Sequence, residues 1–176
     1  SGPIVIRAGR VDVSERALKL TGLRVALADD EAVVAGTVGL DRLRPTRLDL
    51  TVKGYLSPRA LEIYLSDHIT RASGEPSSLD LAITGDVAQP KIRGRVLLRP
   101  LQLGLRAAGN EVTLRSGQIS FHGGNVSLGA IRGTIDEGSF TVSGSLQLEG
   151  LEIAGLNLRF QGENIPYRSS GTYEVE

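Results

Sequence analysis

Histidines and clustered acidic residues are the side chains of this chain that could support catalysis or hold a metal. The two histidines, His68 and His122, lie far apart and belong to no hydrolase or metalloprotease motif. Asp29, Asp30 and Glu31 form an acidic run, but the alternating ligands and the glycine of a calcium loop are missing. We interpret His68 as a helix-end residue, His122 as a turn residue and the acidic run as a solvated turn. The sequence therefore predicts no enzyme activity, no metal site and no cofactor.

Two further patterns could bind a ligand. Gly123-Gly124 looks like a phosphate-cradling pair, but no lysine motif follows it, so a hairpin turn is predicted. A set of basic residues alternates along one predicted strand and recurs after it: Lys91, Arg93, Arg95, Arg99, Arg106 and Arg115. We interpret this set as a solvated outer face. The alternative is a basic rim that meets anionic head groups.

Composition limits the class of protein. Among 176 residues, 20 are basic and 20 acidic, so the formal net charge is zero and the basic excess of a nucleic-acid-binding protein is missing. Cysteine is absent, which excludes disulfides and thiolate chemistry and fits an oxidising compartment. Aromatic residues make up only 4%, so any core must be aliphatic.

A recurring order of glycine, polar residue and apolar residue indicates short strands. It occurs at Gly36-Thr37-Val38, Gly94-Arg95-Val96 and Gly144-Ser145-Leu146, among other places. Alternation of apolar and polar residues usually follows, which is typical of strands with one dry face. Short turn signals separate the segments, so antiparallel hairpins are expected. The predicted strand segments are 3–6, 23–27, 34–40, 48–52, 79–83, 92–98, 101–105, 112–114, 119–121, 126–128, 140–148, 156–160 and 173–175.

One segment follows a helical pattern instead. Ser57 is a good N-cap, Pro58 suits the first helical position, and apolar residues recur at helical spacing, so a short amphipathic helix is predicted over 58–69. A polar loop is expected at 71–78. Residues 57–78 are thus interpreted as a helix-plus-loop insert.

Residues 3–176, including this insert, are expected to be a single unit excised from a longer protein. Ser1-Gly2 is interpreted as an expression-tag remnant. No apolar run approaches the roughly 20 residues of a membrane span, so an anchor is expected outside this chain.

Two all-β architectures fit these elements. The dry faces of two sheets could meet in a sandwich, or one mostly antiparallel sheet could curl and leave its inner face as a groove. Glycines inside strands, such as Gly36, Gly54, Gly94 and Gly144, suit bending, and the scarcity of rings to fill a wide core favours the curled sheet.

The second half of the chain resembles the TamB family. The run 85–98 is similar to a phrase of that family that links consecutive strands, in which glycine, proline, glycine and alternating apolar residues recur in fixed order. Segments 117–121, 133–140 and 144–148 are similar to later strands, and 162–168 resembles a strand-ending element. The resemblance is clear over 85–176, whereas the first half of the chain shares only the general character of the family's strands.

This resemblance implies a function as well as a fold. TamB-type proteins are anchored in the inner membrane, span the periplasm of diderm bacteria and partner an outer-membrane barrel of the BamA-like class (TamA type). Their repeats are thought to form a U-shaped "β-taco" with an apolar lumen, and related AsmA-like and bridge-like proteins carry lipids. The resemblance therefore implies a periplasmic segment that shields acyl chains in phospholipid transport or outer-membrane biogenesis. The residues expected to line the lumen are Leu79, Leu81, Ile83, Val96, Leu98, Leu101, Leu103, Leu105, Phe121, Leu128, Phe140, Val142, Leu146, Leu148, Leu156, Leu158 and Phe160.

Other functions remain open at this point. The chain could be a chaperone that pairs its strand edges with a hydrophobic polypeptide, such as a nascent outer-membrane barrel or autotransporter. It could also be a structural β-sandwich without cargo. A β-helix lyase is disfavoured, because no carboxylate or basic cluster recurs on a strand face.

Overall fold

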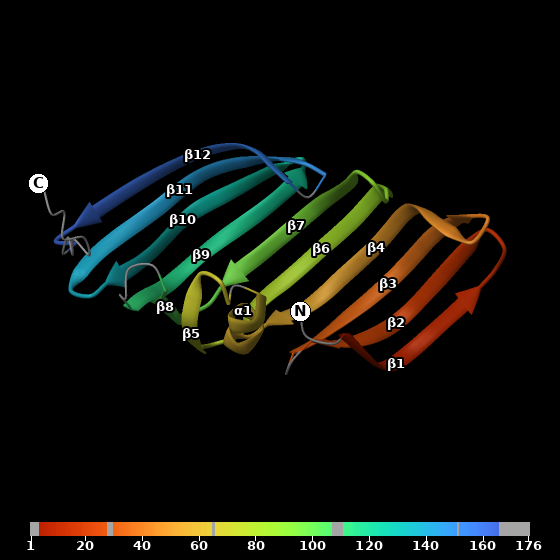
Figure 1. Cartoon of the computed structure of the whole chain (residues 1–176), viewed down its shortest axis with the longest axis horizontal. Coiled ribbons are helices and arrows are strands. Elements are labelled where there is room, and N and C mark those ends of the chain that lie inside the picture. The colour runs from red at the N-terminus through yellow and green to blue at the C-terminus, as the bar shows by residue number, and fades with distance from the viewer. Residues whose placement is uncertain (1–3, 28–29, 65, 107–110, 151, 166–176) are drawn as a thin grey trace, which may run out of the picture.

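The computed structural model describes residues 4–27, 30–64, 66–106, 111–150 and 152–165. Within these ranges the chain forms twelve β-strands and one short helix (Figure 1). The predicted all-β class with a single short helix is therefore confirmed. The strand predicted at 173–175 lies outside the described residues.

The strands are mostly longer than their sequence segments suggested, because polar residues at both ends continue the pairing. The elements are β1 (Ile4–Val13), β2 (Ala17–Leu27), β3 (Asp30–Asp41), β4 (Arg44–Leu56), α1 (Pro58–Tyr64), β5 (Ile69–Gly74), β6 (Ser77–Asp86), β7 (Pro90–Leu98), β8 (Leu101–Leu105), β9 (Glu111–Gly123), β10 (Asn125–Ile135), β11 (Gly138–Glu149) and β12 (Glu152–Glu163).

All twelve strands belong to one antiparallel sheet. Ten of them lie side by side in the order β1-β2-β3-β4-β6-β7-β9-β10-β11-β12, while β8 pairs with β9 and β5 pairs with β8. The edge strands β1 and β12 do not pair with each other, so the sheet is open rather than closed. The described residues form no second sheet, and a sandwich of two sheets is therefore not the architecture of this part of the chain.

The strand register places apolar residues on the same face of the sheet from edge to edge. Residues paired directly across antiparallel strands share a face. One such row, which we call the Phe121 row, crosses nine strands: Leu23, Val34, Val52, Leu81, Gly94, Phe121, Val126, Leu146 and Leu156. We call the face that carries this row the apolar face.

The opposite side of the sheet, here called the polar face, carries the intervening residues. An adjacent row across seven strands is made of Lys53, Asp80, Arg95, Ser120, Ser127, Ser145 and Asn157. The strict change of polarity from one row to the next is the period-2 alternation seen in the sequence, now aligned between strands.

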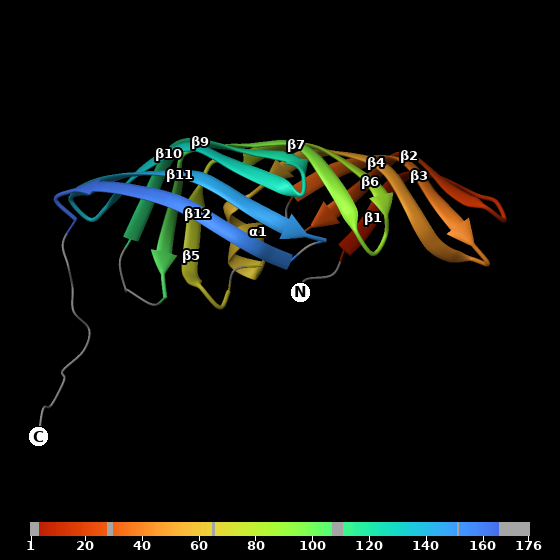
Figure 2. The same ribbon diagram turned by 90° about the horizontal axis from the view of Figure 1, so that it is seen from above.

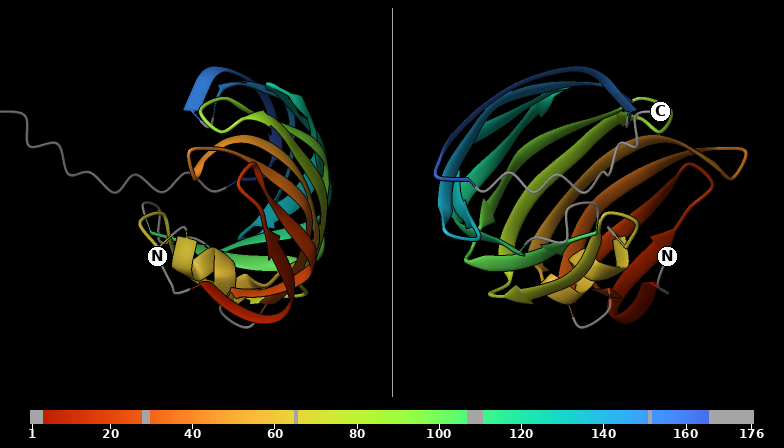
Figure 3. Two further views of the ribbon diagram at one scale, coloured as in Figure 1. Left: turned by 90° about the vertical axis from the view of Figure 1, so that its right-hand side faces the viewer. Right: turned by 60° about the vertical axis from the view of Figure 1, so that its left-hand side comes forward.

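The strands bend along their length, and the bend makes one side of the sheet concave (Figures 2 and 3). Helix α1 lies on the concave side (Figure 3). Leu61 of α1 packs against a cluster of Ile69, Ala72 and Leu101. Leu101 is paired with Leu114 and so belongs to the apolar face. The concave side is therefore the apolar face.

Some glycines occupy strand positions at which a residue with a side chain would be strained. Gly94 has φ of 125° and Gly144 has φ of 147°, both inside the range that L-residues rarely adopt. A Cβ on Gly94 would also lie well inside contact distance of the carbonyl oxygen of Asp80 on the neighbouring strand. These glycines thus let adjacent backbones approach closely, as the glycine pattern predicted for bent strands.

The helical insert differs from its prediction at its end. The start is confirmed, because the Ser57 Oγ accepts a hydrogen bond from the Ala60 amide at 3.2 Å and Ser57 therefore acts as the N-cap. However, α1 ends at Tyr64, residues 66–68 form a turn, and Ile69 opens β5. The prediction of a helix to 69 and of a loop over 71–78 was wrong here, since residues of β5 pair with β8 and Ser77 already begins β6.

A corner joins the main sheet to the β5–β8 pair. The Glu75 amide donates to the Pro100 carbonyl at 2.9 Å, and the Arg99 amide donates to the Ser77 hydroxyl at 3.2 Å. Ser77 is only 2% exposed, and its hydroxyl gives the Arg99 amide, which lies beyond the end of β7, a hydrogen-bond acceptor. Beyond this corner, β5, β8 and α1 lie next to one another on the concave side of the main sheet (Figure 2).

Candidate functional site

The apolar face, which the strand register extends over most of the sheet, is the candidate functional site. Only a few apolar side chains anywhere in the sheet are buried, and most of those on this face are half-buried or exposed. An uncovered apolar surface of this kind usually marks an interaction site in a soluble protein. The structure thus offers one broad surface that could take an apolar ligand.

The seventeen residues expected to line a lumen fall into groups that differ in accessibility. Strands β6, β7, β9, β10 and β11 contribute a half-buried group on the apolar face: Leu79, Leu81, Ile83, Val96, Leu98, Phe121, Leu128, Val142, Leu146 and Leu148. This group is partly open to a ligand and forms the centre of the candidate site.

Strand β12 presents the most open part of the face. Leu156, Leu158 and Phe160 are 62%, 45% and 56% exposed, because nothing covers this edge strand among the described residues. Phe160 stacks on Phe140 with ring centroids 5.8 Å apart. Phe140 itself is 7% exposed, so it supports Phe160 rather than offering surface of its own.

Strand β8 is covered by α1 and β5. Leu101 is 3% exposed and, with Ile69 and Ala72, forms a packed cluster against which Leu61, Leu103 and Leu105 also rest. Leu101, Leu103 and Leu105 therefore lie on the predicted face but inside a local core. A charge at Leu103 would disturb this packing and would not report on an open groove.

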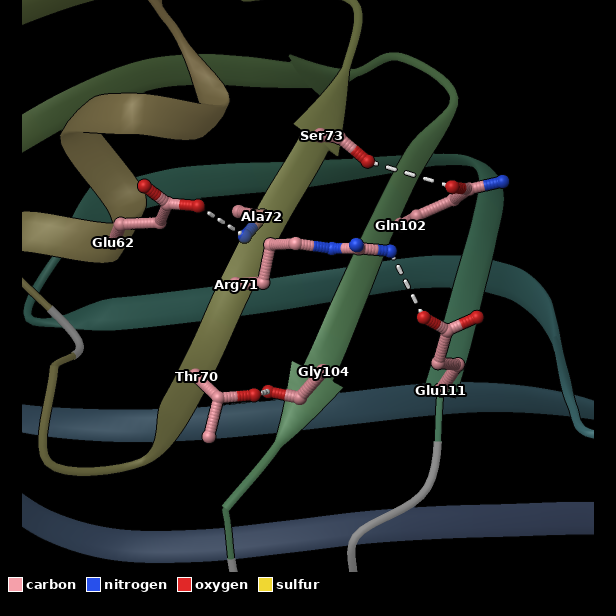
Figure 4. A network of polar contacts seen from close by, with 8 residues as sticks. All are labelled: Glu62, Thr70, Arg71, Ala72, Ser73, Gln102, Gly104 and Glu111. Atoms are coloured by element: carbon pink, nitrogen blue, oxygen red, sulfur yellow. Dashed lines mark hydrogen bonds and ion pairs between the residues drawn. The ribbon is translucent and has the colours of Figure 1, made fainter.

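Helix α1 is held over the sheet by two hydrogen bonds from backbone amides to carboxylates. The Ser57 amide donates to Asp30 Oδ2 at 2.6 Å. The Ala72 amide donates to Glu62 Oε1 at 2.7 Å, as Figure 4 shows. Asp30 is 9% exposed and opens β3, so its prediction as part of a solvated turn was wrong. Asp29 lies outside the described residues.

Polar contacts also tie β5 to β8 and β9 (Figure 4). Arg71 Nη2 donates to Glu111 Oε1 at 3.0 Å, passing over Gly104, which has no side chain and is paired with both residues. Both charged side chains are mostly exposed, so this ion pair contributes at most about 1 kcal/mol. The Thr70 hydroxyl donates to the Gly104 carbonyl at 3.3 Å.

The titratable residues considered for catalysis are not brought together. His68 is an exposed turn residue before β5, whereas His122 lies in β9 near its end rather than in a turn, opposite Arg93 and Asn125. Across the described ranges, no group of three or more His, Cys, Asp or Glu could hold a metal. No described helix is long and apolar enough to cross a membrane.

Sequence reasoning missed the first half of the apolar face. Strands β2, β3 and β4 contribute a set with the same alternation and the same side of the sheet: Leu18, Leu20, Leu23, Val34, Val38, Leu48, Leu50 and Val52. The signal was present in the alternation of 48–52, but the resemblance that directed attention to the lumen covered mainly the later strands.

The basic residues Lys91, Arg93 and Arg95 lie on the polar face, as the interpretation of a solvated outer face predicted. Arg93 and Arg95 occupy the middle of that face on β7, between β6 and β9, and not the rim of the sheet. Comparisons with protein-family models, curated proteins and solved structures found no match to this chain.

Proposed function

We propose that the chain is a segment of a periplasmic bridge between two membranes, and that its concave apolar face shields lipid acyl chains from water. One observation carries the proposal: the Phe121 row and its neighbours keep apolar residues on one side of the sheet across its whole width. The resemblance to the TamB family supports a periplasmic location, an anchor in the inner membrane and an outer-membrane partner of the BamA-like class.

The energetics suit this role. Keeping a 16-carbon acyl chain in water costs on the order of 12 kcal/mol, because each CH₂ contributes about 0.8 kcal/mol. An aliphatic surface recovers much of this cost without directional demands. Because the face lacks polar side chains that could fix a head group, a chain can slide along it. The described sheet is open and not strongly curled, so the U-shaped groove of the proposal requires further curling in the full-length protein as well as an uncovered concave side.

The test compares positions on opposite faces of one strand. A benzophenone amino acid is placed at Leu81 or Leu158 on the apolar face, and at Thr84 or Arg159 as controls on the polar face of the same strands. After irradiation in a diderm bacterium, mass spectrometry of the purified chain should show lipid adducts at Leu81 and Leu158 only. No lipid adduct at either position, or equal adducts on both faces, would overturn the proposal.

A second arm measures affinity. Leu81→Asp should weaken binding of a fluorescent 16-carbon fatty acid by about tenfold or more, because it places a charge in the path of the chain. Ala82→Asp adds the same charge to the polar face and should leave binding unchanged. Far-UV circular dichroism confirms that both variants keep the sheet.

A second candidate function is a chaperone for barrel strands. It is favoured by the edges of β1 and β12, each of which has only one neighbouring strand among the described residues. The same benzophenone sites discriminate the two functions. Adducts that are polypeptides at Leu158, with none that are lipids at Leu81, would favour the chaperone.

A further inference from the structure

The polar face contains a hollow that the proposed lipid function does not use. It lies over β6, β7 and β9 and has a volume of about 530 Å³. Its lining includes the basic residues Arg93 and Arg95, the acidic residue Asp80, and Ser120 and His122. A hollow of this size is within the range of small-ligand sites.

The strand register explains why a hollow forms here. Arg93 is paired with Ala82 on one side and His122 on the other. Arg95 is paired with Asp80 and Ser120. Ala82 and Ser120 are small and lie diagonally opposite each other on the two sides of β7. They therefore form the floor of the hollow, and the longer side chains around them form its walls.

The two arginines are not neutralised within the described part of the chain. Asp80, the acidic residue opposite Arg95, makes its ion pair with Lys53 on the other side, at 3.4 Å. Neither Arg93 nor Arg95 makes a side-chain hydrogen bond or ion pair with another described residue. The hollow therefore carries a local positive charge although the net charge of the chain is zero.

A hydroxyl donor is available beside them. Gln118 Nε2 donates to Ser120 Oγ at 2.8 Å, so the Ser120 oxygen acts as acceptor in this contact and its own hydrogen is left to donate. Two guanidinium groups and one hydroxyl thus surround the same space. A carboxylate has two oxygens and is satisfied by one bidentate arginine, whereas a phosphoryl group has enough oxygens for all three groups.

We propose that this hollow binds a phosphoryl group through Arg93, Arg95 and Ser120. Because it lies on the face opposite the acyl-chain surface, a lipid lying on the apolar face cannot place its own head group here. The phosphoryl group belongs either to a soluble phosphate compound or to the head group of a membrane that meets the polar face. The chemistry of recognition is the same in both cases.

The first experiment titrates the whole chain with inorganic phosphate by calorimetry at fixed ionic strength. Wild type should show saturable binding to one site, and Arg93→Gln and Arg95→Gln should each weaken it about tenfold, as expected for loss of a charge-assisted hydrogen-bond pair. Arg132→Gln removes the same charge from β10 of the same face and should leave affinity unchanged. Ala82→Leu keeps every charge but fills the floor of the hollow with a larger side chain, and should therefore weaken phosphate binding as well.

The second experiment identifies the source of the phosphoryl group. Cosedimentation with phosphatidylglycerol vesicles that is lost in the Arg93→Gln/Arg95→Gln double variant assigns a lipid head group. Binding of inorganic phosphate without vesicle binding assigns a soluble phosphate compound. The proposal is overturned by failure of wild type to bind either probe saturably, by equal losses in Arg132→Gln, or by binding that survives in the double variant.

Discussion

At the scale of single residues, some glycines inside the strands occupy positions that a residue with a side chain could not take without strain. Gly94 combines a positive φ with a neighbouring backbone that leaves no room for a Cβ. The sequence could predict that such glycines mark bent strands, because their recurrence before alternating segments was visible. It could not predict which of them have positive φ. Gly54, for instance, does not have a positive φ and is restricted only by the close approach of Ala32 and the Glu31 carbonyl oxygen.

Gly94→Ala should therefore destabilise the fold by roughly 2–4 kcal/mol, through backbone strain and a clash with the Asp80 carbonyl. Urea unfolding followed by circular dichroism measures the change. Gly129→Ala is the matched control, because an added Cβ there would meet nothing closer than an ordinary contact of 3.4 Å. Equal stability of the two variants would contradict this account of Gly94.

At the scale of elements, the short helix owes its position to tertiary contacts more than to its own sequence. Helix α1 has only seven residues, too few for stability in isolation. Ser57-Pro58 correctly predicted its first turn, but its end depended on Ile69, which joins the β5–β8 pair. The helical spacing that continued to His68 could not reveal this, because Ile69 fits an apolar helix position and a buried strand position equally well.

Glu62 links α1 to the free edge of β5 by accepting the Ala72 amide. Glu62→Ala should leave that part-buried amide without its partner and cost about 1–3 kcal/mol. Hydrogen exchange at Ala72 should accelerate accordingly. Glu62→Gln keeps an acceptor oxygen and should cost less, while Glu137→Ala in an exposed turn should have little effect. Unchanged exchange at Ala72 in Glu62→Ala would contradict a role for this hydrogen bond in holding α1 against β5.

At the scale of the whole molecule, the sheet has one local core and two uncovered ends. The buried cluster of Ile69, Ala72 and Leu101 lies beneath α1, whereas every residue of β12 except Gly155 is exposed. Composition anticipated the absence of a ring-filled centre. The sequence could not show that the described strands would form a single open sheet. Alternation predicts that each strand has one apolar face, but it does not predict what packs against that face.

Amide exchange should follow this layout. Amides of β5 and β8 should exchange most slowly among the strands, and those of β1 and β12 fastest, because local opening costs least where few apolar contacts are lost. Exchange followed by mass spectrometry of peptides from each strand measures the gradient. A uniform protection across the sheet would indicate that the strands open only by global unfolding.

The pairing order has a consequence for how the chain reaches this structure. Most strands pair with the strand next to them in sequence, and the exceptions are β4 with β6, β7 with β9, and β5 with β8, the last of which skips β6 and β7. Pairing between consecutive strands needs only a short turn to close, so little loop-closure entropy is lost before each such pairing is rewarded. Hairpins can form independently and then join, as in repeat proteins whose units contact only their neighbours. Folding should thus begin in the hairpins of consecutive strands, and the β5–β8 pair, which skips two strands, should form after them.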